Sequence, residues 1–166
     1  PYIAIVPGAR WNVKEWPLDH WSRFLKRLTD KGLSAVVLGG NDDREKGRRL
    51  KEQDASGLVF DYTGKTDLRQ LMAAIDESLV YLSADTGPLH IANALKKELI
   101  ALFGTTSPER TGPYGGQDSA YIHLVISPTS KATPEEPLVD DPDCMAQITV
   151  DTVWNLFEEV LKKVEP

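Results

Sequence analysis

The chain has 166 residues, of which 41% are hydrophobic, and it therefore suits one compact domain with a sizeable core. Its formal net charge of -6 repels polyanions and excludes a general nucleic-acid binder, so any anion must be bound by a local site. The single cysteine, Cys144, excludes an internal disulfide, and no apolar stretch reaches the about 20 residues that cross a bilayer, so we expect a soluble cytoplasmic protein.

Six short apolar runs bounded by Gly, Pro and polar residues are predicted to be strands buried on both faces. They are residues 2–6, 34–38, 58–62, 79–83, 99–103 and 121–126. Apolar residues at helical spacing predict intervening helices over 18–28 and 68–75, the latter capped by Thr66, and a closing helix over 150–164. This alternation predicts an α/β fold with a doubly wound parallel sheet of about six strands.

Two polar stretches receive no function. Residues 42–53 are so rich in Arg, Lys and Glu that they predict a solvated helix rather than a binding patch. Residues 127–147 carry Pro, Ser, Thr and acids without periodicity, which predicts a long surface connection before the last helix. We assign no role to residues 127–143.

The first candidate site follows the first strand. In sheets of this kind ligands bind outside the carboxyl ends of the strands, where loops meet helix N-termini. The segment PGARWNVKEWP lacks the GxGxxG pattern of a dinucleotide-binding turn, which argues against a dehydrogenase. Gly8 permits close backbone approach, and Arg10 and Lys14 offer positive charge that suits a phosphate. The alternative is that Lys14 is merely exposed and that Trp11 and Trp16 merely pack.

Two further loops are weaker candidates. In GGNDD, residues 39–43, Asn41 or Asp43 can meet a sugar hydroxyl, although a turn and helix cap explains the same residues. In YTGKTD, residues 62–67, Lys65 and Thr66 follow a strand where a base or ribose can lie, and again a turn plus a cap is the alternative.

The richest joint is SADTGPLHIANAL, residues 83–95. Asp85 or Thr86 is predicted to cap a helix, Gly87 lets the chain turn, and Pro88 suits the first helical position. Capping leaves His90 unexplained, in a first turn where backbone N–H groups and the helix dipole favour an anion. We therefore expect a diphosphate at this joint, with a purely structural histidine as the alternative.

Five segments, taken in chain order, closely resemble the C-terminal half of the glycosyltransferase family 9 heptosyltransferases, which build the inner core of bacterial lipopolysaccharide. These segments are PGARWNVKEWP, GGNDD, ADTGPLHIANAL, IALFGTTSPERTGPYG and DCMAQITVDTVW. The most specific parts are DTGPLHIANAL and FGTTSPERTGPYG, and the resemblance spans nearly the whole chain.

The resemblance implies a GT-B architecture, in which two Rossmann-like halves face a cleft and the C-terminal half holds the nucleotide-sugar donor, here ADP-heptose. Residues 1–166 would then be a single donor-binding domain, with the N-terminal acceptor domain absent from this chain. The donor-binding residues carried over by position are Gly8, Ala9, Arg10, Lys14, Asn41, Asp43, Lys65, Thr66, Asp85, Thr86, Gly87, Pro88 and His90.

The resemblance also implies an inverting transfer that needs no metal or other cofactor. Lys14 and the amides after Asp85 would stabilise the charge that grows on the leaving diphosphate. The general base would come from the N-terminal half, so the isolated fragment is expected to be inactive. That half would also bind the lipid A or lipopolysaccharide core acceptor, and the whole protein is expected to associate peripherally with the cytoplasmic face of the inner membrane.

Two alternatives remain at this point. One is a non-enzymatic receiver-like signalling domain, with Asp42 and Asp43 as an acidic pocket, although the first strand then ought to end in acids and ends instead in PGAR. The other is the C-terminal half of a different GT-B enzyme, such as a nucleotide-sugar epimerase.

Overall fold

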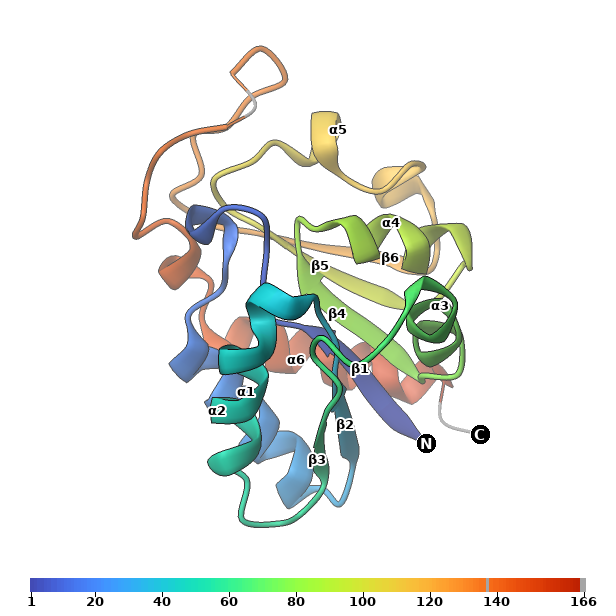
Figure 1. The fold of residues 1–166 in the computed structure, drawn as a ribbon. Helices are drawn as coiled ribbons and strands as arrows, with labels where there is room; N and C mark the ends of the chain where they lie inside the picture. The colour runs from blue at the N-terminus through green and yellow to red at the C-terminus, as the bar shows by residue number, and fades with distance from the viewer. Residues whose placement is uncertain (137, 165–166) are drawn as a thin grey trace.

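The computed structural model describes residues 1–136 and 138–164. Six strands alternate with helices along the chain (Figure 1). The strands are β1 (Tyr2–Val6), β2 (Ser34–Val37), β3 (Val59–Asp61), β4 (Val80–Ala84), β5 (Leu99–Phe103) and β6 (Ile122–Ile126). The helices are α1 (Leu18–Asp30), α2 (Arg44–Glu52), α3 (Leu68–Asp76), α4 (Gly87–Ala94), α5 (Pro108–Thr111) and α6 (Val150–Val164), with short 3-10 turns η1 (Asn12–Lys14), η2 (Asn41–Asp43), η3 (Gly116–Asp118) and η4 (Met145–Gln147).

All six strands form one sheet in the order β3-β2-β1-β4-β5-β6, and every strand pair is parallel. Ile3 of β1, for example, pairs with Ala35 of β2 on one side and with Val80 of β4 on the other. The chain starts in the middle of the sheet and winds outward in both directions, which confirms the predicted doubly wound α/β fold.

Helices cover both faces of the sheet, as Figure 1 shows. On one face α1 and α6 pack against β1, β4 and β5 through an aromatic cluster in which Phe24 contacts Trp154 and Phe157 edge to face. On the other face α3 and α4 contribute Ile75, Leu89 and Ala92 to a second core cluster. Buried apolar side chains on both faces explain why the strands read as continuous hydrophobic runs.

Two details differ from the sequence prediction. Helix α3 is capped by Asp67, whose side chain accepts a hydrogen bond from the N–H of Gln70, while Gln70 bonds back to the N–H of Asp67. The predicted cap, Thr66, is therefore wrong by one residue, because the reciprocal capping box needs Gln three positions after the cap. The charged stretch 42–53 does form a helix, α2, but it begins with the turn η2.

The predicted surface connection over 127–147 is only partly on the surface. Cys144 and Met145 are buried, and a Cβ placed on Gly104 would lie 2.6 Å from Met145 Sδ. Because residue 104 is a glycine, η4 can pack against the C-terminal end of β5. Pro137 of this segment and the chain end at 165–166 lie outside the described residues.

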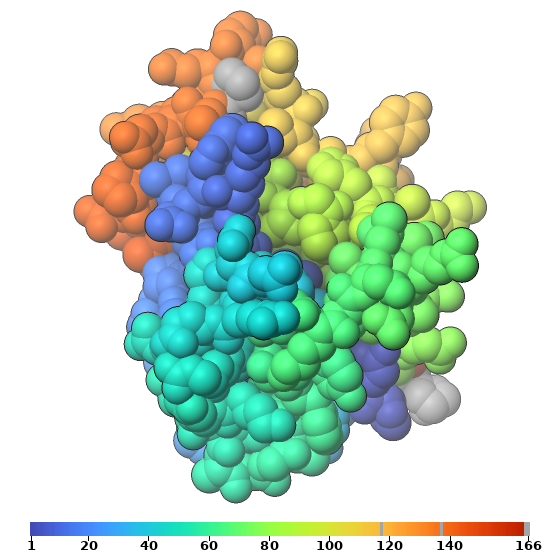
Figure 2. All heavy atoms as spheres, viewed as in Figure 1, coloured from blue at the N-terminus to red at the C-terminus, as the bar shows by residue number. Residues whose placement is uncertain are grey.

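The carboxyl ends of the strands meet at one edge of the sheet, where the loops after β1, β2, β3, β4 and β5 converge. Figure 2 shows the molecular surface hollowed where the loop after β1, the start of α2, the loop before α3 and the start of α4 come together. In the part of the chain that is described, no helix combines the length and the apolarity that crossing a bilayer requires.

Candidate functional site

The hollow at the sheet edge has a volume of about 380 Å³, within the range of small-ligand pockets. Several predicted donor-binding residues line it, and they come from four separate joints of the chain, those after β1, β2, β3 and β4. Its lining is Val6, Gly8, Ala9, Arg10, Gly39, Gly40, Asp43, Thr66, Asp67, Leu68, Leu71, Thr86, Gly87 and Pro88. The structure thus brings together eight of the predicted residues, namely Gly8, Ala9, Arg10, Asp43, Thr66, Thr86, Gly87 and Pro88.

Lys14 and Asp85 form an ion pair next to this hollow. Lys14 Nζ lies 2.7 Å from Asp85 Oδ2, and the two side chains are only 12% and 7% exposed. The ammonium also sits 4.7 Å from the centre of the Trp11 ring, in a cation–π contact. Lys14 is therefore largely buried and ion-paired, so the alternative that this lysine is merely exposed is wrong. For Trp16 the packing alternative is right, because its ring is buried in the core.

The start of α4 differs from a purely structural cap. Thr86 occupies the N-cap position in an extended conformation, yet its side chain makes no capping hydrogen bond, and Pro88 is the second helical residue rather than the first. Asp85 does not cap the helix either, since its carboxylate binds Lys14 and Thr111. The first N–H groups of any helix lack intrahelical acceptors, so this end can still receive an anion.

Two buried hydroxyls have no hydrogen-bond partner at acceptable geometry among the described residues: Thr86 Oγ1, on a residue that lines the hollow, and Tyr81 OH, in the core. Burial raises the pKa of Tyr81 well above its usual range, and the nearby Ser83 and Thr86 hydroxyls oppose only part of this rise. Tyr81 is consequently a neutral phenol at ordinary pH. An unpaired buried hydroxyl is costly in a folded protein, and Thr86 can satisfy its own by rotating toward an acceptor in the hollow.

The loop after β2 is fixed by its own carboxylate. Asp43 Oδ2 accepts a hydrogen bond from the N–H of Gly40 at 2.9 Å, and Asp43 Oδ1 lies 3.4 Å from Lys46 Nζ. Lys46 also contacts Glu15 Oε1 at 2.6 Å, and this same oxygen accepts the N–H of Ala9 at 3.0 Å. The network joins the loop after β2 to the loop that carries Arg10 and Lys14.

The loop after β3 is held in the same way. Lys65 Nζ donates to the carbonyl of Asp61 at 2.7 Å and to its carboxylate at 2.9 Å, while Thr63 Oγ1 donates to Asp61 Oδ1 at 2.6 Å. The Gly64 N–H donates to the Gly39 carbonyl, so this loop packs on the loop after β2. Lys65 therefore already has partners and does not line the hollow.

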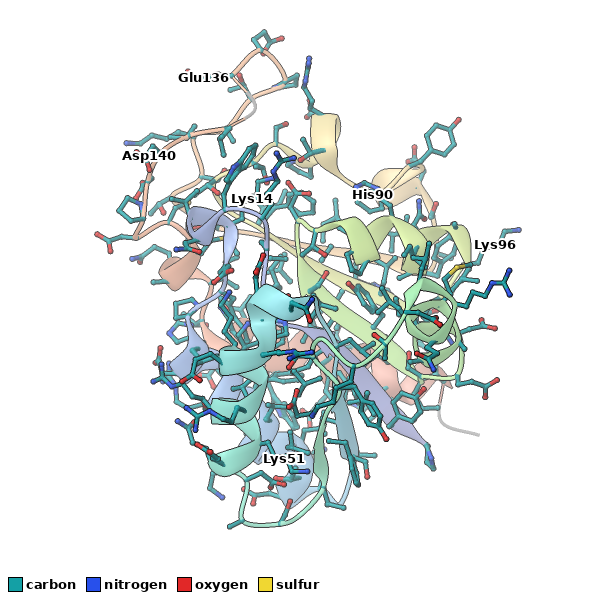
Figure 3. All side chains as sticks on the ribbon, viewed as in Figure 1. Lys14, Lys51, His90, Lys96, Glu136 and Asp140 are labelled. Atoms are coloured by element: carbon teal, nitrogen blue, oxygen red, sulfur yellow. The ribbon has the colours of Figure 1, made fainter. Side chains whose placement is uncertain are left out.

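Four other predicted residues also lie outside the lining of the hollow, namely the ion-paired Lys14 and Asp85 and the exposed Asn41 and His90. Asn41 is exposed on η2, where its Oδ1 would lie 2.7 Å from a Cβ built on Gly64. His90 is exposed on α4, and Figure 3 shows it on the same end of the molecule as Lys14. Donor binding by Asn41 and His90 therefore stays a prediction.

Four residues near the site were not predicted: Glu15, Lys46, Thr105 and Thr111. Thr105 Oγ1 donates to the carbonyl of Val13 at 3.1 Å, and Thr111 Oγ1 donates to Asp85 Oδ2 at 3.0 Å. Both threonines lie in FGTTSPERTGPYG, so this motif, which carries much of the family resemblance, was the sequence signal that could have identified them. Within the described ranges, no group of three or more His, Cys, Asp or Glu side chains is placed to hold a metal ion.

The pattern of the family described as Glycosyltransferase family 9 (heptosyltransferase) matches residues 1–138. Lipooligosaccharide heptosyltransferase 2 of Haemophilus influenzae is 30% identical over 167 residues, covering 98% of this chain and 48% of that protein. Lipopolysaccharide heptosyltransferase 2 of Escherichia coli is 34% identical over 119 residues, covering 68% of this chain and 34% of that protein.

The solved structures agree. The structure of E. coli ADP-heptose lps heptosyltransferase II superposes with a TM-score of 0.81 at 26% identity, over 98% of this chain and 47% of that chain. The chain thus spans about half the length of the relatives it matches. The receiver-like alternative is wrong, because the heptosyltransferase family match covers residues 1–138. The loop after β1 also carries Arg10 and Lys14 rather than the acids that a receiver would need there. The chain belongs to glycosyltransferase family 9, the heptosyltransferases, and has the Rossmann-like fold of the C-terminal half of a GT-B enzyme.

Proposed function

We propose that this chain binds the nucleotide-sugar donor, ADP-heptose, for a heptosyltransferase that acts on the lipopolysaccharide inner core. The observation that carries the proposal is the joint between β4 and α4, where a helix N-terminus and an unpaired Thr86 hydroxyl meet the hollow and Asp85 holds the Lys14 ammonium at the same joint. The relatives support the same ligand, since one solved structure at 23% identity is E. coli heptosyltransferase WaaC with ADP and another is WaaC with ADP-2-deoxy-2-fluoro heptose.

The diphosphate is proposed to lie between the first turn of α4 and Lys14. Lys14 has three N–H donors, and Asp85 Oδ2 accepts from one. The low exposure of the pair strengthens the contact of the remaining donors with a phosphate oxygen. As the sugar leaves, negative charge grows on the diphosphate, and Lys14 and the α4 amides stabilise the transition state more than the ground state.

The finer chemistry is also part of the proposal. The acceptor hydroxyl attacks the anomeric carbon as ADP departs, with inversion, and the general base comes from the half of the enzyme that this chain lacks. No metal is proposed to take part, because the Lys14 ammonium and the helix amides supply the countercharge. The whole enzyme is proposed to act in the cytoplasm, at the inner face of the membrane that holds its lipid acceptor.

Calorimetric titration of the 166-residue chain tests donor binding. ADP and ADP-heptose should bind about tenfold more tightly than UDP, and Lys14→Met should weaken ADP binding about tenfold. Lys26→Met is the matched control, because Lys26 also pairs with an aspartate, Asp30 at 2.9 Å, but on the exposed face of α1. Equal weak binding of all nucleotides, unaffected by Lys14→Met, would overturn the proposal.

Product analysis with the full-length enzyme tests the reaction. Glycosylated lipid with inverted anomeric configuration, formed equally well in excess EDTA, is the expected result. Epimerised donor without glycosylated lipid would favour the epimerase alternative, and loss of activity in EDTA would contradict a metal-independent transfer. Glycosyl transfer by the isolated 166-residue chain would refute the assignment of the base to the other half.

A further inference from the structure

The segment after β5 makes two hydrogen bonds around the Lys14–Asp85 ion pair, one to the backbone just before Lys14 and one to Asp85 itself. It contains FGTTSPERTGPYG, the motif that carries much of the resemblance although none of its residues was predicted to act. Thr105 Oγ1 donates to the Val13 carbonyl at 3.1 Å, and Thr111 Oγ1 donates to Asp85 Oδ2 at 3.0 Å. One threonine thus binds the loop of the lysine, and the other binds its carboxylate partner.

Thr105 fixes the point from which the Lys14 side chain departs. It is 1% exposed, and the carbonyl that it binds belongs to the residue immediately before Lys14. Thr105 is itself anchored, because its carbonyl accepts the N–H of Val139 at 2.8 Å and its neighbour Thr106 forms an isolated bridge with Leu138. The segment 127–143, to which the sequence analysis assigned no role, therefore anchors Thr105 through its backbone.

Thr111 fixes the carboxylate at the other end. Asp85 is 7% exposed, and its Oδ2 accepts from both Lys14 Nζ and Thr111 Oγ1. The Thr111 hydroxyl also lies 3.1 Å from the carbonyl oxygen of Ser107, the residue that precedes α5. One hydroxyl therefore links the first turn of α5 to Asp85. Two donors on one carboxylate oxygen restrict where the ammonium can sit.

We propose that Thr105 and Thr111 are positioning residues that hold the Lys14 ammonium at the place where it meets the donor diphosphate. Lysine carries its charge on a flexible four-carbon stem, so an unanchored ammonium loses rotamer entropy each time it binds a phosphate. Restraining both the backbone before Lys14 and its carboxylate partner removes part of that cost before the ligand arrives. Neither threonine lines the hollow, and both hydroxyls are already engaged by the protein, Thr105 with the Val13 carbonyl and Thr111 with Asp85.

This inference rests on the proposed role of Lys14, and it predicts an effect that depends on Lys14. Thr→Val keeps the shape of the side chain and removes its hydroxyl, whereas Thr→Ser keeps the hydroxyl. A residue that acts by placing Lys14 matters for ADP binding only while Lys14 is present. A residue that merely supports the fold affects binding equally in both backgrounds.

The test is a double-mutant cycle read by calorimetric titration of the chain with ADP. Thr105→Val and Thr111→Val should each weaken ADP binding about fivefold in the Lys14 background and by less than about 1.5-fold in the Lys14→Met background. Thr105→Ser and Thr111→Ser should restore the affinity. If Thr105→Val does not fold, Thr111→Val on the more exposed α5 supplies the decisive cycle.

Two control variants remove comparable hydrogen bonds elsewhere. Tyr2→Phe loses the bond from Tyr2 OH to the Ala74 carbonyl at 2.7 Å, and Thr29→Val loses the bond from Thr29 Oγ1 to the Lys26 carbonyl at 3.1 Å. Neither should change ADP affinity. Equal losses in both Lys14 backgrounds, or no loss in either, would overturn the inference while Lys14→Met still weakens binding. If Lys14→Met itself has no effect, the proposed function fails and the inference fails with it.

Discussion

The carboxylate of Asp43 occupies the space that a side chain at Gly8 would need. A Cβ built on Gly8 would lie 1.6 Å from Asp43 Oδ1 and 2.4 Å from its Cγ. The close approach predicted for this glycine is therefore made first by the neighbouring loop. Because Asp43 also binds the N–H of Gly40, residue 8 must lack a side chain for the loop after β2 to adopt its conformation.

Gly8→Ala should lower the free energy of unfolding by about 1–3 kcal/mol, because the new methyl group overpacks against a carboxylate that is already engaged. Urea denaturation measures the loss. In the Asp43→Ala background all three atoms nearest to the new methyl group are gone, so the same change should cost less there. Gly40→Ala is the matched control, since its Cβ meets nothing within 4 Å and should leave stability nearly unchanged. Equal costs at residues 8 and 40 would contradict the prediction.

Asp67→Ala should destabilise the protein by about 1 kcal/mol, because it removes both the cap of α3 and the anchor of the reciprocal Gln70 bond. Thr66→Ala, one residue earlier, should have little effect on thermal unfolding. Thermal and urea unfolding of the two variants decide between the observed cap and the cap predicted from sequence. A larger loss from Thr66→Ala than from Asp67→Ala would restore the sequence prediction.

The strands were predictable because each leaves a short apolar run in the sequence, and the central strands β1, β4 and β5 are buried on both faces. Their ends were less predictable. Strand β3 has only three residues, Val59–Asp61, and the carboxylate of its last residue binds Thr63 and Lys65 in the loop that follows. Such a local side-chain lock leaves no hydrophobic signal.

The loops that form the site were predictable one at a time, but the contacts between side chains of different loops were not. Lys14 and Asp85 were both expected near a diphosphate, yet they are 71 positions apart and nothing in the sequence shows that they pair. Thr111 reaches Asp85 only because α5 lies over the start of α4 (Figure 1). Contacts between loops depend on the packing of the whole sheet edge, which local patterns do not encode.

Lys46→Met should reduce the free energy of unfolding by about 1 kcal/mol, since Glu15 loses a charged partner while it still holds the Ala9 N–H. Burial acts to lower the pKa of Lys46, but the Glu15 and Asp43 carboxylates outweigh it and raise the pKa above 10.5. The stabilisation is therefore fully present below pH 10.5 and is lost as the pH rises through the higher folded-state pKa. Urea denaturation measures the change, and Lys51→Met, an exposed lysine of the same helix (Figure 3), should have almost no effect. Equal losses in the two variants would show that the link from Lys46 to Glu15 contributes nothing.

Asp61→Asn should destabilise the protein by about 1 kcal/mol at neutral pH, because the carboxylate accepts bonds from Thr63 and Lys65 that an amide replaces only in part. Burial acts to raise the pKa of Asp61, but the Thr63 and Lys65 hydrogen bonds outweigh it and hold the pKa below 3.8. A depressed folded-state pKa contributes stability that is present above pH 3.8 and is lost as the pH falls through the lower folded-state value. The difference between wild type and Asp61→Asn, measured by urea denaturation, should therefore shrink between neutral pH and about pH 3. Asp42→Asn, at an exposed position of η2, controls for a general effect of removing one negative charge. A difference that stays constant with pH would mean that Asp61 stabilises the loop by shape alone and not by its charge.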